Sequence, residues 1–264
     1  MNATSTLRRE TFPASAATTL RLTAQEADIT VRHEPTDTAV VEVSAREEVD
    51  FGPVDITASG DEIVVRVPPL LTDQDGRHGL AIDLGFVSFS LGDARVRGLR
   101  VDVTLPERAC LVVGTKSGDV QVSGTSGRAV LRTGSGDISL EHADELETHC
   151  GSGDVVVGRV VGDAEARSGS GDVVVRHASG TFAGGSGSGD LRVERFDGGT
   201  ITLRAASGDI HVGVPRGVPV WQDVTTASGD VLAQLEEVGQ PGEGEPFITV
   251  RATTASGDIT LVNV

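Results

Sequence analysis

Apolar and polar positions alternate along the chain around one repeated tripeptide, Ser-Gly-Asp, whose plainest copy is Ser152-Gly153-Asp154. In every copy the first and third residues after the Asp are apolar, as Val155 and Val157 are here, and the residue between them follows no rule. The other copies begin at Ser117, Ser135, Ser170, Ser188, Ser207, Ser228 and Ser256. Alternation with a period of two, carried mainly by β-branched residues, predicts a β-strand with one buried face after each tripeptide.

A second strand is predicted before each tripeptide. Positions eight, six and four before the Asp form another inward ladder, whose residues become smaller toward the turn, as in Leu111, Val113 and Thr115. The serines of successive copies are 18, 17, 18, 18, 19, 21 and 28 residues apart (135−117 through to 256−228). Each unit of about 18 residues is therefore predicted to be strand, Ser-Gly corner, strand and loop, with a core that narrows near the corner.

One such unit cannot bury enough apolar surface to fold alone. Burial of a large apolar side chain contributes about 1.5–3 kcal/mol, whereas ordering one residue costs about 1.5 kcal/mol. The few inward residues of a unit cannot offset about eighteen ordered ones, so the units must share burial and hydrogen bonds with their neighbours. The sequence therefore predicts an all-β fold, namely a parallel β-solenoid (β-helix) with coils of about 18 residues.

The chain divides into an irregular, β-rich N-terminal part with the first coils, residues 1–107, and a regular array, residues 108–264. We expect the two to form one continuous domain. Residues 1–18 are expected to be an irregular lead-in, and residues 70–97 a long loop or an excursion hairpin. The tripeptide at Ser59 is predicted to be a hairpin turn rather than a corner, because the apolar positions after it are shifted by one.

The C-terminal end of the array lacks an obvious cover. The chain stops at residues 259–264, directly after the last tripeptide, and no helix, proline or charged run follows. An unpaired strand edge invites pairing with another chain. We therefore expect self-association through the C-terminal coil, most simply as a two-fold dimer. The acidic insertion at residues 235–246 is the other candidate cover for this edge.

Composition and charge narrow the classes of function. Among 264 residues there are 34 Gly, 7 Phe, 1 Trp and no Tyr, which fits many tight corners around a thin aliphatic core. The net charge of −17 argues against nucleic acid as a partner. Residues 1–17 lack the apolar stretch of a signal peptide, and no stretch is long enough to span a membrane. We therefore expect no membrane insertion and a cytoplasmic location.

The Asp residues of the tripeptides are the strongest candidates for a binding site. In stacked coils they lie in one column, formed by Asp119, Asp137, Asp154, Asp172, Asp190, Asp209, Asp230 and Asp258. At the strand spacing of about 4.8 Å, neighbouring carboxylates repel by about 0.9 kcal/mol in water and about 3.5 kcal/mol at an effective dielectric of 20. Solvent and turn amides neutralise them in the favoured interpretation, and a row of bound cations does so in the alternative. The calcium β-roll repeats every nine residues, so it matches poorly.

Other chemically reactive residues give weaker signals. Cys150 falls on the small inward ladder and is interpreted as a buried structural thiol, whereas Cys110 has the opposite parity. His142 and His149 flank a loop near Cys150, but their spacing fits no zinc template. The serines lie in turns, outside any strand-to-helix elbow, and the Gly-rich runs lack a following helix. We therefore predict no catalytic residue, no metal site and no cofactor.

The repeat, together with the segment Val101-Asp102-Val103-Thr104-Leu105-Pro106, resembles the bacterial β-strand-repeat family called domain of unknown function 4097, whose members are often labelled adhesins. The resemblance implies a parallel β-solenoid and brings no catalytic residues. We therefore expect a non-enzymatic β-solenoid scaffold or adhesin-like interaction protein, with an unknown protein partner. The alternative is a carbohydrate-binding or carbohydrate-active β-helix, for which a single Trp provides few aromatic platforms.

Overall fold

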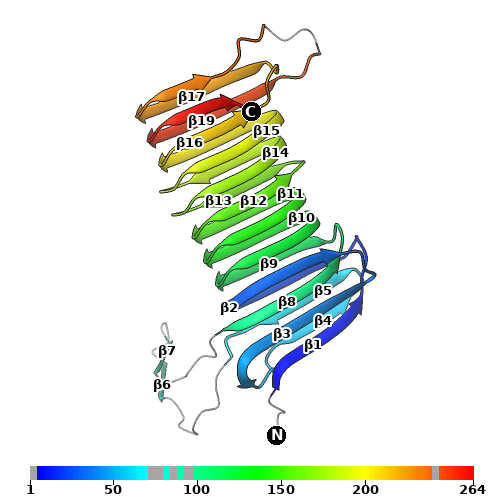
Figure 1. The fold of residues 1–264 in the computed structure, drawn as a ribbon. Coiled ribbons are helices and arrows are strands. Elements are labelled where there is room, and N and C mark those ends of the chain that lie inside the picture. The colour runs from blue at the N-terminus through cyan, green and yellow to red at the C-terminus, as the bar shows by residue number, and fades with distance from the viewer. Residues whose placement is uncertain (1–4, 71–79, 84–87, 92–97, 240–243) are drawn as a thin grey trace.

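The computed structural model describes residues 5–70, 80–83, 88–91, 98–239 and 244–264, and these contain strands and turns but no helix. The described residues accordingly include no helix capable of crossing a membrane. Eighteen strands join in one hydrogen-bonded sheet, which is arranged as a long stack (Figure 1). We call the strands before the Ser-Gly-Asp corners ladder A, the strands after them ladder B, and the two strands joined by one corner a repeat unit.

The two ladders share five long strands that bend from one ladder into the other. Ladder A consists, in spatial order, of β4 (Asp55–Ser59), β5 (Glu62–Val67), β2 (Thr19–Glu34), β9 (Cys110–Ser117), β10 (Val120–Ser135), β11 (Ile138–Ser152), β13 (Ala164–Ser168), β14 (Val173–Ser186), β15 (Leu191–Ser207), β19 (Ile248–Ser256) and β17 (Val220–Ser228). Ladder B consists of β1 (Ser5–Pro13), β3 (Thr38–Val49), β8 (Leu99–Pro106), β2, β10, β11, β12 (Val155–Val160), β14, β15, β16 (Ile210–Val214), β20 (Ile259–Asn263) and β18 (Val231–Gln234).

Within the array, every strand pairs in parallel with the equivalent strand of the neighbouring unit, and equivalent residues lie opposite each other. Val155 is opposite Val173 in ladder B, and Leu146 is opposite Ala164 in ladder A. Strand β2 of the N-terminal part pairs with both β9 and β10, so hydrogen bonding runs without a break into the array. Among the described residues of the large sheet, the pairing is antiparallel only at the N-terminal end of the stack, where β3 separates β1 from β8 and β4 pairs with β5.

The core lies between the two ladders, and the inward and outward positions follow the predicted alternation. Val155 and Val157 are completely buried, whereas Val156 between them is only partly covered. The core of the N-terminal end includes Phe51 and Val54, which lie in the connection from β3 to β4 and are both buried. The all-β prediction is therefore confirmed.

Three details of the N-terminal part bear on the predictions. Residues 5–13 form the regular strand β1, so the expected irregular lead-in is wrong there. Strand β1 lies at the edge of ladder B, and its half-buried residues are Arg8, Glu10 and Phe12, so it carries no apolar alternation. The turn at Ser59 does join the antiparallel hairpin β4–β5. Strands β6 (Leu80–Asp83) and β7 (Ser88–Leu91) form a separate antiparallel pair, as the excursion hairpin predicts, and the rest of residues 71–97 lies outside the described residues.

The C-terminal end corrects one expectation. The final strand β20 is not at the edge of the stack, because it pairs with β16 on one side and with β18 on the other. Strand β19, which belongs to the same unit as β20, lies likewise between β15 and β17. The outermost unit is therefore β17–β18, which comes earlier in the sequence. The ladder positions are equivalent in every unit, so the alternating pattern does not reveal the order in which units stack.

Candidate functional site

The Asp residues of the corners lie in one continuous column, which begins one unit earlier than predicted, at Asp28 of β2. In this column the backbone N–H of each Asp donates to the carboxylate Oδ1 of the Asp in the preceding unit. The bond from Asp119 to Asp28 is 3.3 Å long, and those from Asp137 to Asp119, Asp154 to Asp137, Asp172 to Asp154, Asp190 to Asp172, Asp209 to Asp190, Asp258 to Asp209 and Asp230 to Asp258 are 2.8–2.9 Å long.

These bonds outweigh the repulsion within the column. A hydrogen bond to a charged group contributes about 1.5–3 kcal/mol net, whereas two carboxylates at this spacing repel by about 0.9 kcal/mol when water surrounds them. Asp137 and Asp154 are exposed, so the smaller repulsion applies. Turn amides therefore suffice to hold the column together.

The glycine of each corner allows the neighbouring unit to approach closely. Gly153 has a φ of 148°, and a Cβ added to it would lie 2.3 Å from the carbonyl oxygen of Gly136 in the preceding unit. By contrast, a Cβ on Gly60 of the β4–β5 hairpin would have no atom within 4 Å. The same tripeptide thus has a stacking requirement in the array that it lacks in the hairpin.

A column of side-chain donors on the inward side completes most corners. In six units the residue four positions before the Asp donates from its side chain to the glycine carbonyl of the neighbouring unit, as Ser168 Oγ does to Gly153 at 2.9 Å. Thr115 donates to the carbonyl of Ser117 instead, and Ala205 has no donor. Cys150 occupies the same position, and its Sγ donates to Gly136 at 3.2 Å. Burial raises the pKa of the Cys150 thiol, which keeps it protonated as a donor. In the sequence this column is recognisable as small residues, and the further signal that indicates side-chain donors is that six of the eight are Ser or Thr.

A buried histidine joins the N-terminal part to the array. His33 Nδ1 lies 2.8 Å from the carbonyl oxygen of Pro106, which can only accept, so Nδ1 carries the proton. Nε2 then accepts from the hydroxyl of Ser126 at 2.9 Å. Ser126 is completely buried and His33 is 6% exposed, so this Ser–His pair cannot meet a substrate. Burial lowers the pKa of His33 below its ordinary value of 6.5, against the opposing effects of the Pro106 carbonyl and Glu107.

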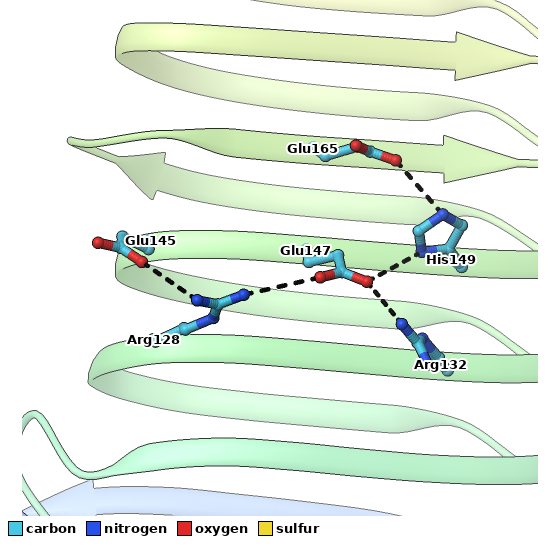
Figure 2. A network of polar contacts seen from close by, with 6 residues as sticks. All are labelled: Arg128, Arg132, Glu145, Glu147, His149 and Glu165. Atoms are coloured by element: carbon cyan, nitrogen blue, oxygen red, sulfur yellow. Dashed lines mark hydrogen bonds and ion pairs between the residues drawn. The ribbon is translucent and has the colours of Figure 1, made fainter.

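A network of ion pairs covers the outward side of ladder A across three units. Figure 2 shows six of its members, Arg128, Arg132, Glu145, Glu147, His149 and Glu165, and Arg167 also belongs to it because its Nε lies 2.9 Å from Glu165. Arg132 donates to Glu147 at 2.6 Å, and this bond holds the pKa of Glu147 below its ordinary value. Exposed ion pairs contribute about 0–1 kcal/mol each. The network therefore determines how charge is arranged on this surface and contributes little to the stability of the fold.

A shallow groove of about 410 Å³ borders this network. Its lining includes four carboxylates, from Glu145, Glu147, Asp163 and Glu165, and one guanidinium, from Arg128. The groove reaches the next unit, where the lining residues are the small Thr181 and Ala183. Small side chains beside a charged unit create a depression. Beside the lining, Arg132 pairs with Glu147 and Arg167 pairs with Glu165, so the four carboxylates meet three guanidinium groups and an excess of one negative charge remains. A second groove of about 400 Å³ lies on the outward side of ladder B.

The residues that a zinc hypothesis would combine do not converge. Cys150 points into the core toward Gly136, whereas His149 lies on the outward side of the same strand, with Nε2 3.4 Å from Glu165. Adjacent residues of a strand face opposite sides of the sheet. Among the described residues no group of three or more His, Cys, Asp or Glu is arranged to hold a metal ion.

The fold and its corners define an all-β repeat protein whose units are linked by Ser-Gly-Asp columns. The chain matches the model of the family described as Toastrack DUF4097 over residues 17–262, so the protein belongs to this family. This confirms the resemblance seen in the sequence. No match was found among curated proteins.

Solved structures show the same fold at low sequence identity. A structure described as a "putative adhesin" from Parabacteroides distasonis is 11% identical, with a TM-score of 0.55 and 96% of each chain covered. Another "putative adhesin", from Bacteroides fragilis, is 9% identical, with a TM-score of 0.53 and 97% of each chain covered. At these identities the likeness concerns the fold alone.

We expect the Asp column to need no metal ion. Millimolar calcium or a chelator should leave the melting temperature almost unchanged, because turn amides already occupy the inner carboxylate oxygens. Asp154→Asn keeps an acceptor oxygen and should cost little, whereas Asp154→Ala should cost about 1–3 kcal/mol. Thermal melts measure both. A rise of many degrees with calcium, abolished by Asp154→Asn, would instead establish a cation row.

Stability should fall as the pH drops below about 6.5, in part because of His33. Its folded pKa is lowered, so the unfolded chain binds the proton first and folding loses free energy as the pH falls through the unfolded pKa toward the folded pKa. Each unit of lowering corresponds to about 1.4 kcal/mol. His33→Gln should be less stable than wild type at pH 7.5 and lose less on acidification to pH 5, as measured by urea unfolding.

The control for this experiment is His142→Gln, because the His142 side chain is 43% exposed. This variant should retain the pH dependence of the wild type. If His33→Gln also retained it in full, the buried histidine would not be the group responsible.

Proposed function

We propose that this protein is a non-enzymatic β-solenoid scaffold with an adhesin-like interaction role. In this proposal, the stacked units serve as a rigid support and the outward side of ladder A contacts a protein partner. The inward positions and corners are committed to stacking, since their side chains are buried or hydrogen-bonded to the next unit. The outward positions are free to vary, and these are the positions that carry charge.

The observation that carries the proposal is the groove beside the ion-pair network. Four carboxylates and one guanidinium line it, next to a floor of Thr181 and Ala183. The excess of carboxylates favours a partner segment that carries Lys or Arg, and complementary charge accelerates such an encounter. The two solved structures named above are both described as "putative adhesin", which supports a role in binding rather than in catalysis.

The carbohydrate alternative has one observation in its favour. Trp221, the only Trp, lies in the outermost unit and is 49% exposed. The guanidinium of Arg251 lies 5.5 Å from the centre of its ring, so one face of this platform is already occupied. A glycan array and a polysaccharide-hydrolysis screen distinguish the two functions. We expect neither specific sugar binding nor turnover, and either result would contradict the scaffold proposal.

The partner itself can be identified by cross-linking. A photoreactive residue in place of Thr181 should capture it, whereas the same residue in place of Thr260, on the outward side of ladder B, should not. With the purified partner, the double variant Asp163→Asn and Glu165→Gln should weaken binding about tenfold, which corresponds to about 1.4 kcal/mol. Added salt should weaken binding to the wild type as well.

The double variant Asp223→Asn and Glu237→Gln serves as the matched charge control, because both residues are exposed and lie in β17 or just after β18, far along the stack from the groove. It should leave the affinity unchanged. Equal affinities for the groove variant and the wild type would show that the partner binds elsewhere.

A further inference from the structure

The last segment of the chain is inserted into the stack out of order. Residues 248–264 form β19 and β20, which lie between the unit β15–β16 and the unit β17–β18 (Figure 1). Its inward residues Ile248, Val250, Ile259 and Leu261 are all completely buried. The segment therefore fills a slot whose two walls are formed by earlier parts of the chain.

The slot accepts any segment with the right motif, whatever the position of that segment in the sequence. The inserted unit and the outermost unit share the hexapeptide Thr-Thr-Ala-Ser-Gly-Asp, at residues 253–258 and 225–230, and these pair residue for residue. The corner bond of Asp258 to Asp209 and that of Asp230 to Asp258 are both 2.8 Å long. Because the same bonds would form with the same segment of another copy, nothing in the slot distinguishes its own chain from a second one.

The connection to the inserted segment is long. Strand β18 ends at Gln234 and β19 begins at Ile248, which leaves thirteen residues (248−234−1). The same change of ladder from β12 to β13 takes three residues, 161–163. Thirteen extended residues span about 43–47 Å. The segment can therefore reach a slot in a neighbouring molecule.

The outermost unit is the part of the array that covers the slot least firmly. From Val220 to Gln234 no residue is buried, and the inward Val231 is 45% exposed. Local opening occurs most readily where few apolar contacts are buried. When this unit opens, one side of the inserted segment is released.

Simple end-to-end pairing of the outermost units would be small. An edge of nine residues, the length of β17, over a core about 10 Å thick covers about 300 Å² per molecule. Stable interfaces bury about 800 Å² per partner. An exchange of segments instead re-forms the buried contacts already present within one chain, which makes it an inexpensive route to a dimer.

We propose that two copies of this chain associate by exchanging residues 248–264, each segment filling the slot of the other molecule. The exchange joins two scaffolds at their C-terminal ends. It is independent of the partner and the groove considered above. It also revises the expected self-association: the C-terminal residues are exchanged rather than paired as an exposed edge.

Single-cysteine variants of the full chain test the exchange, in a background with Cys110→Ser and Cys150→Ser. Arg204 of β15 and Thr253 of β19 are exposed and lie opposite each other, within disulfide range for neighbouring strands. An Arg204→Cys chain and a Thr253→Cys chain are refolded together at increasing concentration and then oxidised. We expect a covalent heterodimer whose share rises with concentration, with the bond mapped by mass spectrometry between the two replaced positions.

Ser139 and Val156 provide the matched control pair, because they also face each other on neighbouring strands. They lie in the middle of the array, where the units stack in the order of the sequence. The Ser139→Cys and Val156→Cys chains should give no heterodimer. A chain carrying both Arg204→Cys and Thr253→Cys should close its bond internally at low concentration. If that internal bond forms but the mixed chains yield no heterodimer, or yield only dimers without this bond, the exchange proposal is overturned.

Discussion

The close contact between one Ser-Gly-Asp corner and the next is the constraint on which the whole molecule depends. At this contact a glycine with φ 148°, Gly153, lies against the carbonyl of Gly136, which in turn accepts from the Cys150 thiol inside the core. On the outside, the amide of Asp154 donates to the carboxylate of Asp137. Most corners thus satisfy polar groups of their neighbour on both sides of the sheet, at a spacing that allows no side chain on the glycine. Buried polar groups are costly when unpaired, so a unit is stable only beside another corner of the same kind.

This constraint explains two features that seem unrelated. A corner requires a neighbouring corner but not a particular chain order. Residues 248–264 can therefore lie between the unit β15–β16 and the outermost unit β17–β18, although both precede them in sequence. The corners and inward positions also take up all the stacking requirements, which leaves the outward positions free. Over β10, β11 and β13 those positions carry Arg and Glu residues that pair between units. Exposed pairs add little to stability, which favours a role for this surface in recognition.

Much of the fold can be predicted from the sequence because its rule is local. Alternation identified the inward residues, such as Val155, and a shift of one position identified the turn at Ser59 as a hairpin. Strand β1 was missed because its half-buried positions hold Arg8, Glu10 and Phe12, so apolar residues do not alternate along it. The place of β19–β20 was missed because residues 225–230 and 253–258 are identical and fit the same neighbours. For the candidate site, the sequence showed the Asp column but not its amide partners. The network around Glu147 could not be predicted because it depends on the strand register, which decides which residues lie side by side.

The most direct test of this account compares one substitution in two copies of the same tripeptide. Gly153→Ala places a methyl group against the Gly136 carbonyl, whereas Gly60→Ala meets no neighbouring atom and must only adopt a φ of 57°. Urea unfolding should show a cost of about 1–2 kcal/mol for Gly60→Ala, from backbone conformation alone. The cost should be about 3 kcal/mol or more for Gly153→Ala, where overlap of the methyl group with the Gly136 carbonyl adds to the strain of a φ of 148°. Equal costs at the two positions would contradict the claim that corner stacking, rather than turn formation, governs the fold.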